Sequence, residues 1–192
     1  MKMAEYMLEK VLMEVSDITQ GVSGQKPFFL MLCEAGGTRK LSVMIGAFEA
    51  QSILVVMRGV KLERPLLPDV YLQTMRLFGM QLREVVIHKV LDGVYYSSLE
   101  IEQNGIVKLV DVRTSDAIAL ALRCNAPIYT IESLLAREHI FEDGHGAISI
   151  PVSSVDIEVL REALSRAIRD EKYELAAQLR DEIARREKNV GE

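Results

Sequence analysis

The sequence predicts an α+β protein: a mixed or antiparallel sheet built from two strand–strand–strand–helix units, followed by a C-terminal helical hairpin. Three observations predict this fold. Segments 41–54 and 109–122 each run from an apolar strand into an apolar helix, with Glu49 and Asp116 in matching positions. Gly-Gly or Asn-Gly interrupts the strand pair before each copy, as a tight hairpin requires. After Pro151 the strand pattern gives way to residues that favour helices.

The first unit is predicted from the spacing of its apolar residues. Its expected strands are 11–18, 28–35 and 38–45, and its expected helices are 47–58 and 69–78. Gly79 is a natural stop for the second of these helices. We expect Val70, Met75, Leu77 and Phe78 to lie on the inward side of that helix.

The second unit repeats the pattern. Its expected strands are 82–91, 95–102, 106–112 and 128–130, and its expected helices are 115–124 and 131–137. Asp92-Gly93 and Asn104-Gly105 are the hairpin turns. Tyr95 and Tyr96 should face opposite ways on their strand, with core packing as the main expectation and base stacking as the alternative.

The domain organisation predicted is an α+β domain over 1–150 and a helical hairpin over 155–190. The hairpin is amphipathic, with apolar residues three or four apart. Its expected inner face includes Leu164, Ala167, Ile168, Tyr173, Ala176, Leu179 and Ile183. Two short helices bury little apolar area alone, so we expect the hairpin to dock on its own body, a second copy or another protein.

Composition indicates which cellular compartment and which binding partners suit this chain. The 192 residues include no apolar run of about 20, which excludes a membrane-spanning helix. The isolated Cys33 and Cys124 have no metal or redox spacing, and we expect free thiols in the cytoplasm. The net charge of −5 disfavours loose adhesion to nucleic acid, although a local basic groove is compatible with it.

Two known families share motifs with this chain. Segments 41–50, 63–66, 111–121 and 126–128 closely resemble the bifunctional nuclease domain family, over about residues 5–140. Proteins of that family are described as cutting DNA and RNA, so the resemblance implies nuclease activity. Segment 160–187 resembles a UVR domain, the hairpin through which bacterial excision-repair subunits contact each other, and implies a protein partner for 155–190.

The chain departs from the nuclease family's pattern at two places. Leu67-Pro68-Asp69 stands where Thr-His-Asp is usual, so the histidine is missing and only Asp69 carries over. Thr114 replaces the proline of Arg-Pro-Ser-Asp. If that histidine served as a general base or metal ligand, this chain lacks it.

Phosphodiester cleavage requires a positioned water and neutralisation of charge on the phosphoryl oxygens, which carboxylate-bound Mg²⁺ or Mn²⁺ can supply. The catalytic candidates are Glu49, Asp69, Arg113 and Asp116; the metal-ligand candidates are Glu49, Asp111 and Asp116; and the phosphate-binding candidates are Arg64 and Arg113. The hypothesis requires several of these carboxylates to converge. His139 and His145 lack the spacing of a metal pair, and His88 is expected to be solvent-facing or half-buried on its strand.

A purely structural interpretation competes with this chemistry. Glu49, Asp69 and Asp116 all stand at predicted helix starts, where acids stabilise the helix in any protein. Arg113 could simply pair with Asp111 or Asp116. The alternative function is therefore a non-catalytic dimeric scaffold or regulatory module. For both functions we expect a homo-oligomer, most simply a dimer, because exposed sheet edges need covering.

Overall fold

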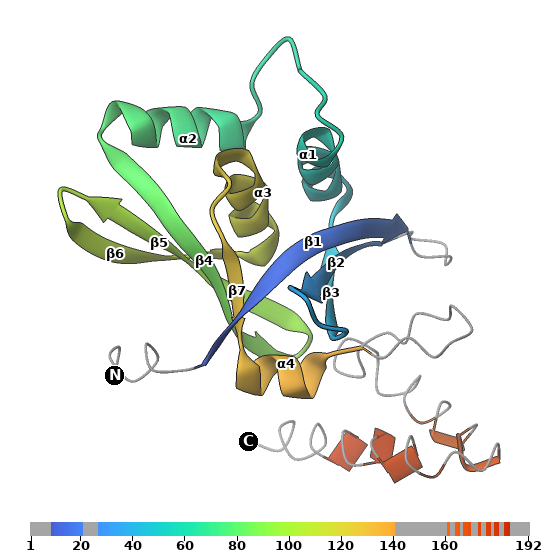
Figure 1. Ribbon diagram of the computed structural model, residues 1–192. Coiled ribbons are helices and arrows are strands. Elements are labelled where there is room, and N and C mark those ends of the chain that lie inside the picture. The colour runs from blue at the N-terminus through green and yellow to red at the C-terminus, as the bar shows by residue number, and fades with distance from the viewer. Residues whose placement is uncertain are drawn as a thin grey trace. The chain divides into compact units, whose positions relative to one another are not determined.

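The computed structural model describes residues 9–20 and 27–140, together with helical residues scattered between 161 and 184. The chain divides into two compact units, one of residues 1–91 and 95–141 and the other of 92–94 and 142–192. The predicted α+β class is confirmed (Figure 1). The elements are β1 (Lys10–Gln20), β2 (Phe28–Glu34), β3 (Lys40–Ile45), α1 (Ala47–Met57), α2 (Leu67–Leu77), β4 (Met80–Leu91), β5 (Val94–Gln103), β6 (Ile106–Arg113), α3 (Thr114–Cys124), β7 (Ile128–Ile131) and α4 (Glu132–Glu138).

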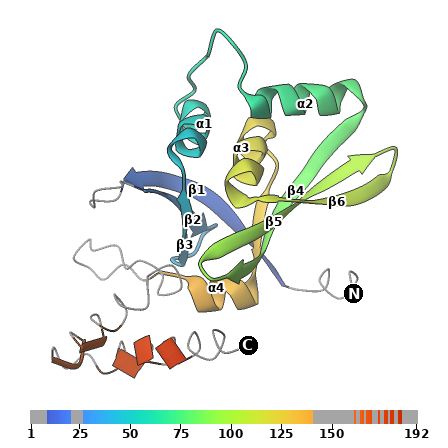
Figure 2. The ribbon, with the colours of Figure 1, turned by 180° about the vertical axis from the view of Figure 1, so that it is seen from behind.

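The strand order reflects the internal repeat. The described sheet has seven strands in the order β3-β2-β1-β7-β4-β5-β6. Each strand–strand–strand–helix repeat thus places its first strand beside β7 and its third strand at an edge of the sheet. A helix follows that third strand. β7 pairs antiparallel with β1 and parallel with β4, so the sheet is mixed. The strands at the two ends of this strongly twisted sheet run in very different directions (Figures 1 and 2).

Two hairpin turns form where the sequence predicts them. Asp92 and Gly93 have φ values of 49° and 75°, and Asn104 and Gly105 have φ values of 53° and 77°. Two consecutive residues with positive φ give the turn whose twist matches that of the flanking strands. Asn, Asp and Gly adopt this conformation at low cost, which explains why these dipeptides close the β4–β5 and β5–β6 connections.

Equivalent residues of the two units form the centre of the core. α3 packs against both α1 and α2. Ile53 of α1 and Leu120 of α3, which occupy matching positions in the repeat, are both buried, as are Ala50 and Ala117. The small alanine side chains allow the two helices to approach closely. Among the described helices, none combines the length and apolarity that crossing a bilayer requires.

The inward face predicted for α2 is partly wrong. Leu72 and Met75 are buried, but Val70, Leu77 and Phe78 have exposed fractions of 42%, 78% and 65%. The reason is that, among the described elements, α2 packs mainly against α3 and β4, so one narrow stripe of the helix is covered. Apolar residues outside that stripe have no neighbouring element in the described chain to bury them.

The described residues of the C-terminal hairpin are helical. Ala167, Ala176, Leu179 and Ile183 are buried together, with Leu164 packed against them, as predicted. Ile168 and Tyr173, which were also expected on the inner face, are 54% and 68% exposed. The buried cluster, in which two of the four residues are alanines, is small and does not cover them. His145 and Pro151 lie outside the described residues.

Candidate functional site

Glu49 and Asp116 occupy the same position in equivalent helices. Each is the third residue of its helix, in α1 and α3 respectively, and each helix directly follows the last strand of its unit. Although β3 and β6 lie at opposite edges of the sheet, the starts of the two helices meet. The internal repeat therefore brings together two carboxylates that are 67 positions apart in sequence.

Arg113 joins these two carboxylates. Its Nε donates a hydrogen bond to Asp116 Oδ2 at 2.8 Å, its Nη2 donates one to Asp116 Oδ1 at 3.2 Å, and its Nη1 donates one to Glu49 Oε1 at 2.9 Å. The two bonds to Asp116, with the one to Glu49, raise the pKa of the guanidinium, which stays charged. Two carboxylates and one guanidinium leave one negative charge. The Arg113 side chain is 67% exposed, so solvent and ligands can reach this cluster.

A buried hydroxyl pair fixes the start of α3. The Ser97 and Thr114 hydroxyls lie 2.7 Å apart and share a hydrogen bond, and both residues are buried. Thr114 directly follows Arg113, at the position where the nuclease family that the sequence resembles usually has proline. The bond to β5 holds the strand-to-helix turn from which the Arg113 and Asp116 side chains project.

Gly46 provides the space that Glu49 occupies. A Cβ atom added at Gly46 would collide with Oε2 of Glu49. Gly46 stands in the first unit where Arg113 stands in the second, each being the residue just before its helix. The absence of a side chain at 46 thus allows the Glu49 carboxylate to fold over the helix start, within reach of Arg113.

Asp69 lies in a different ion pair. Its Oδ2 accepts a hydrogen bond from the Leu66 backbone N–H at 2.8 Å, which caps α2, and its Oδ1 accepts one from Arg123 Nε at 2.7 Å. The Arg123 side chain is only 5% exposed and also donates to the carbonyls of Ala119 and Ser52. The sequence analysis missed Arg123, although a cation inside an apolar helix is itself a sign of a paired site.

The other two candidates are placed apart from the Arg113 cluster. Asp111 pairs across the β5–β6 ladder with Ser98, so both lie on the same face of the sheet. Val112 and Asp116 line a hollow on the opposite face, toward the helices. Arg64 lies in the exposed connection between α1 and α2.

The described ranges 9–20 and 27–140, with the described hairpin residues, contain no group of three or more His, Cys, Asp and Glu side chains arranged to hold a metal. The carboxylates that do meet are the two around Arg113. Of the histidines, His88 is half-buried on β4, and His139 bonds through Nδ1 to the carbonyls of Leu135 and Ala136. Neither histidine accompanies the acidic pair.

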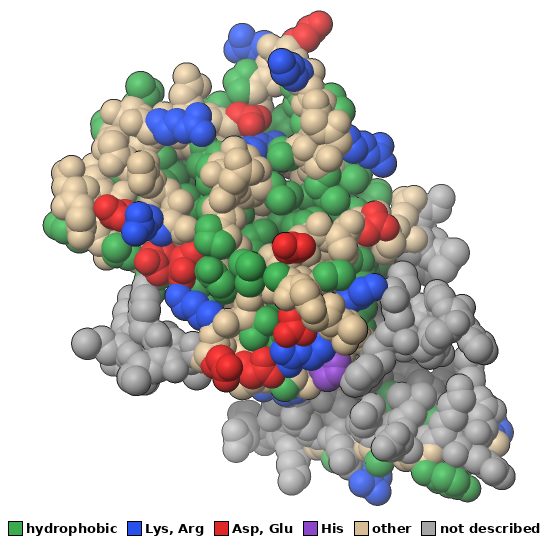
Figure 3. Space-filling view, in the orientation of Figure 1, with side chains coloured by type: hydrophobic (Ala, Val, Ile, Leu, Met, Phe, Trp, Pro, Cys, Tyr) green, Lys and Arg blue, Asp and Glu red, His purple; other side chains and the backbone are tan. Residues whose placement is uncertain are grey.

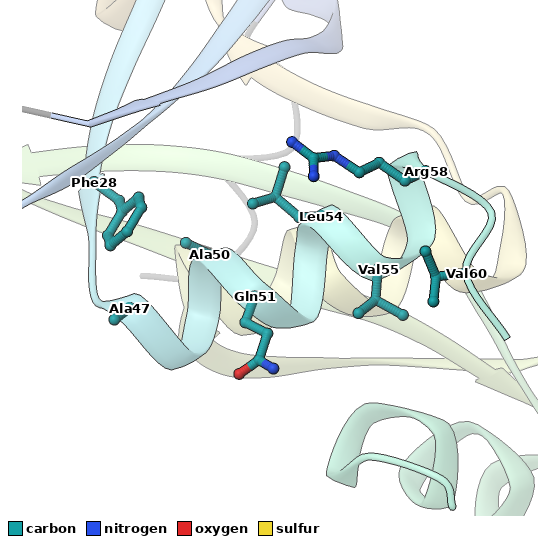
Figure 4. Close-up of a pocket in the computed structure, with 8 residues that line it drawn as sticks. All are labelled: Phe28, Ala47, Ala50, Gln51, Leu54, Val55, Arg58 and Val60. Carbon is teal, nitrogen blue, oxygen red and sulfur yellow. The ribbon is translucent and has the colours of Figure 1, made fainter. Parts of the chain in front are cut away.

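Two hollows flank the helices. The first, of about 230 Å³, opens between α2, α3 and the β5–β6 hairpin, and Asp116 is part of its wall. The second, of about 280 Å³, lies along α1; the ring of Phe28 faces Ala47 and Ala50 there, and Arg58 extends toward Leu54 (Figure 4). Only the first contains a predicted site residue. On the face seen in Figure 3, hydrophobic side chains gather over the helices and the middle of the body.

Comparison with known proteins matches two segments of this chain to two families. The bifunctional nuclease domain model matches residues 30–143, which is more than half of the chain. The chain belongs to the bifunctional nuclease domain family. The UvrB/uvrC motif matches residues 156–188, so both resemblances noted in the sequence are confirmed. The matched region contains Glu49, Arg113 and Asp116.

Relatives of this family occur in bacteria and plants. An uncharacterized protein of Mycobacterium tuberculosis strain H37Rv is 39% identical over 108 residues, which is 56% of this chain and 64% of that protein. Bifunctional nuclease 1 of Arabidopsis thaliana is 23% identical over 179 residues, covering 82% of this chain and 55% of that protein. Bifunctional nuclease 2 of Oryza sativa subsp. japonica is 26% identical over 115 residues, covering 58% and 35%. The chain therefore matches less than two thirds of the length of these relatives.

Proposed function

We propose that this chain hydrolyses phosphodiester bonds of DNA and RNA at the cluster of Glu49, Arg113 and Asp116. Membership of the bifunctional nuclease domain family and the names of the plant relatives support the reaction class. The observation that carries the proposal is the meeting of Glu49 and Asp116 around one exposed guanidinium. Asp69, which pairs with Arg123, is assigned a positioning role for α2.

The donor chemistry of the cluster is compatible with a divalent cation. Mg²⁺ is often held in proteins by one or two carboxylates, the remaining positions being water and substrate oxygens. Glu49 and Asp116 would hold Mg²⁺ or Mn²⁺, and the net negative charge of the cluster favours cation binding. Such an ion supplies an activated water and neutralises charge on the phosphoryl group.

Arg113 has the second role in this proposal. Its guanidinium presents several N–H donors in one plane, which suits two phosphate oxygens. Since it now bonds to both carboxylates, it must exchange at least one of these bonds for a phosphate oxygen when substrate binds. The 67% exposure of its side chain allows this exchange without unfolding of α3.

The test uses the purified full-length chain with supercoiled plasmid and with single-stranded RNA, in Mg²⁺, Mn²⁺ or EDTA. Glu49→Gln and Asp116→Asn are each expected to lower the cleavage rate by about 100-fold or more, beyond the losses seen for residues that only support a metal ligand. Glu102→Gln, which removes a surface carboxylate paired with Arg83, is the matched control and should cleave normally. Cleavage that persists in the Glu49→Gln/Asp116→Asn double variant would reject the proposed site.

A scaffold function is the second candidate, and one observation favours it. β6 is an edge strand of the described sheet, and Ile106, Val107, Leu109 and Val110 along it are 39–63% exposed. An apolar edge strand is suited to pairing with another copy. Light scattering of the wild type and of Val107→Lys tests this candidate, because a dimer formed through β6 should dissociate in the variant. A variant that keeps the wild-type mass would exclude this edge as the contact.

We further propose that the hairpin binds a protein partner, either a second copy or a foreign chain. Ile168 and Tyr173 are exposed apolar side chains outside the hairpin's buried cluster and are the contacts we would expect. Ile168→Glu should abolish the interaction while the helical content of the chain, measured by circular dichroism, stays unchanged. An interaction that survives both Ile168→Glu and Tyr173→Glu would exclude this surface.

A further inference from the structure

The hollow beside Asp116 is small, mostly apolar and lined by one aromatic side chain. It is lined by Leu67, Pro68 and Tyr71 of α2, Val110 and Val112 of β6, and Asp116 of α3, and is hereafter called the α2–β6 pocket. Asp116 is the one charged side chain among these described lining residues. The other lining side chains are apolar or aromatic, and Tyr71 is 39% exposed.

The α2–β6 pocket adjoins the proposed catalytic cluster directly. The Asp116 side chain that lines the pocket is the same one that accepts two hydrogen bonds from Arg113. A phosphate bound by Arg113 would therefore have the pocket mouth next to it. A group that enters the pocket while Arg113 holds its phosphate would be joined to that phosphate by a short link, such as one sugar.

The volume limits the ligand further. About 230 Å³ is below the roughly 300–1,000 Å³ of pockets that enclose a whole small molecule. The α2–β6 pocket thus accommodates one flat ring rather than a nucleotide. Its apolar walls provide no row of donors and acceptors that would read a base edge, whereas an aromatic ring binds any base by stacking.

We propose that the α2–β6 pocket binds the nucleobase next to the scissile phosphate by stacking on Tyr71. This inference rests on the proposed nuclease function and adds the mode of substrate recognition. Such a pocket binds single strands more readily than duplex, because a paired base must first leave its stack and flip out. It is indifferent to base identity and to the sugar 2′-hydroxyl, as an enzyme that cuts both DNA and RNA requires.

Binding is measured by fluorescence anisotropy of a short labelled oligothymidylate with the full-length chain, in Ca²⁺ in place of Mg²⁺, with the oligonucleotide checked for intactness afterwards. Tyr71→Ala should weaken the affinity by roughly 5- to 100-fold, the effect of one lost base–aromatic stack. Tyr71→Phe should bind as the wild type does, because the ring remains. Phe78→Ala, which removes an exposed ring just after the last residue of α2, is the matched control and should also bind normally.

A second arm maps the base itself. Replacing one thymidine at a time by an abasic residue should weaken binding at one position in the wild type and at none in Tyr71→Ala. An oligonucleotide carrying 5-iodouracil at that position should cross-link to Tyr71 on irradiation, as identified by mass spectrometry. Equal binding by wild type and Tyr71→Ala, or a cross-link confined to the opposite face of the sheet, would overturn the inference. Cleavage is scored separately, so a chain that binds as described without cutting would lose the proposed function and keep the pocket.

Discussion

Glu49 and Asp116 accept hydrogen bonds from one guanidinium, although they belong to different halves of the repeat and to helices that follow opposite edges of the sheet. An acid at the third position of a helix needs no special explanation, since it complements the helix dipole. The meeting of two such acids around Arg113 does need an explanation. Stabilisation of a helix dipole requires neither the bond from Arg113 to Glu49 nor the bonds from Arg113 to Asp116. The arrangement distinguishes this pair from Asp69, whose capping bond and ion pair have evident structural roles.

Gly46→Ala should lower the cleavage rate while leaving the free energy of unfolding nearly unchanged. The new Cβ would collide with Oε2 of Glu49 and displace the carboxylate from Arg113. The backbone at 46 has φ −77°, which alanine adopts freely, so the free energy of unfolding should change by less than about 1 kcal/mol. The cleavage rate should fall by about tenfold or more because a reacting group is misplaced. Urea unfolding and plasmid cleavage are compared with those of Gln51→Ala in the same helix; wild-type activity in Gly46→Ala would show that the position of Glu49 is unimportant.

Arg123→Ala should destabilise the body by about 2–4 kcal/mol. The substitution removes a side chain that is 5% exposed and leaves Asp69 and two backbone carbonyls without their donor. Arg76→Ala, at an exposed position near the end of α2, should change the free energy of unfolding by no more than about 0.5 kcal/mol. Urea unfolding followed by circular dichroism measures both. Equal effects of the two substitutions would mean that the Arg123 bonds contribute nothing net.

The loss of folding stability at acid pH should depend on Arg39. Its guanidinium bonds to Glu34 and Glu132, and these bonds hold the pKa of both carboxyls below the ordinary value of 4.5. A lowered carboxyl pKa gives stability that is present above pH 4.5 and is lost as the pH falls toward the lowered value. The pKa of Arg39 is itself raised, which matters only at strongly alkaline pH. Glu132 is the first residue of α4, and acidic and basic side chains gather near that helix on the face seen in Figure 3.

The measurement is the urea midpoint of the wild type and of Arg39→Gln between pH 7 and pH 3. The wild type should be more stable at neutral pH, and the difference should shrink below about pH 4.5 as the two carboxyls are protonated. Arg83→Gln, which removes another surface ion pair, serves as the control and should leave the profile unchanged. A difference that stays constant across this range would mean that the Arg39 bonds do not stabilise the ionised carboxyls.

Tyr95→Phe should leave the protein as stable as the wild type or raise its free energy of unfolding by about 0.5–1 kcal/mol. The Tyr95 hydroxyl is buried and has no hydrogen-bond partner among the described residues, and burial raises its pKa. Removing an unsatisfied buried hydroxyl removes a desolvation cost. Tyr96→Phe, at a half-buried ring on the other face of β5, provides the comparison. A loss of more than about 1 kcal/mol in Tyr95→Phe would reveal a bond to that hydroxyl.

Much of the fold follows from local signals in the sequence. The turn dipeptides at 92–93 and 104–105 fix two hairpins because their backbone conformation is local. Strand and helix limits agree with expectation to within about two residues, as with β6 and α3. The strand order is not local: alternation tells which face a residue takes and says nothing of which strand lies beside it. Hence nothing in the sequence analysis placed β7 between the two halves.

Only the local part of the candidate site's geometry could be predicted from the sequence. Alignment of the two units made Glu49 and Asp116 equivalent, and Arg113 bonds to both, whereas Asp69 and Asp111 lie elsewhere. The alternation of β6 could have assigned Asp111 to the other face, since it stands between Val110 and Val112. The pairing of Asp69 with Arg123 joins two helices through side chains alone, and no periodicity predicts such a contact.

The short strand β7 determines when the body can be completed during synthesis. Lys10 at the start of β1 pairs with Ile131 at the end of β7, and β7 also supplies the partner of β4. Each three-stranded half can form as its own stretch leaves the ribosome, but the two halves cannot be joined until residue 131 has emerged. The inner edges of β1 and β4 therefore stay unpaired from their own synthesis until β7 emerges. A nascent chain stalled between β4 and β7 would expose two unpaired strand edges to chaperones and to neighbouring chains on the polysome.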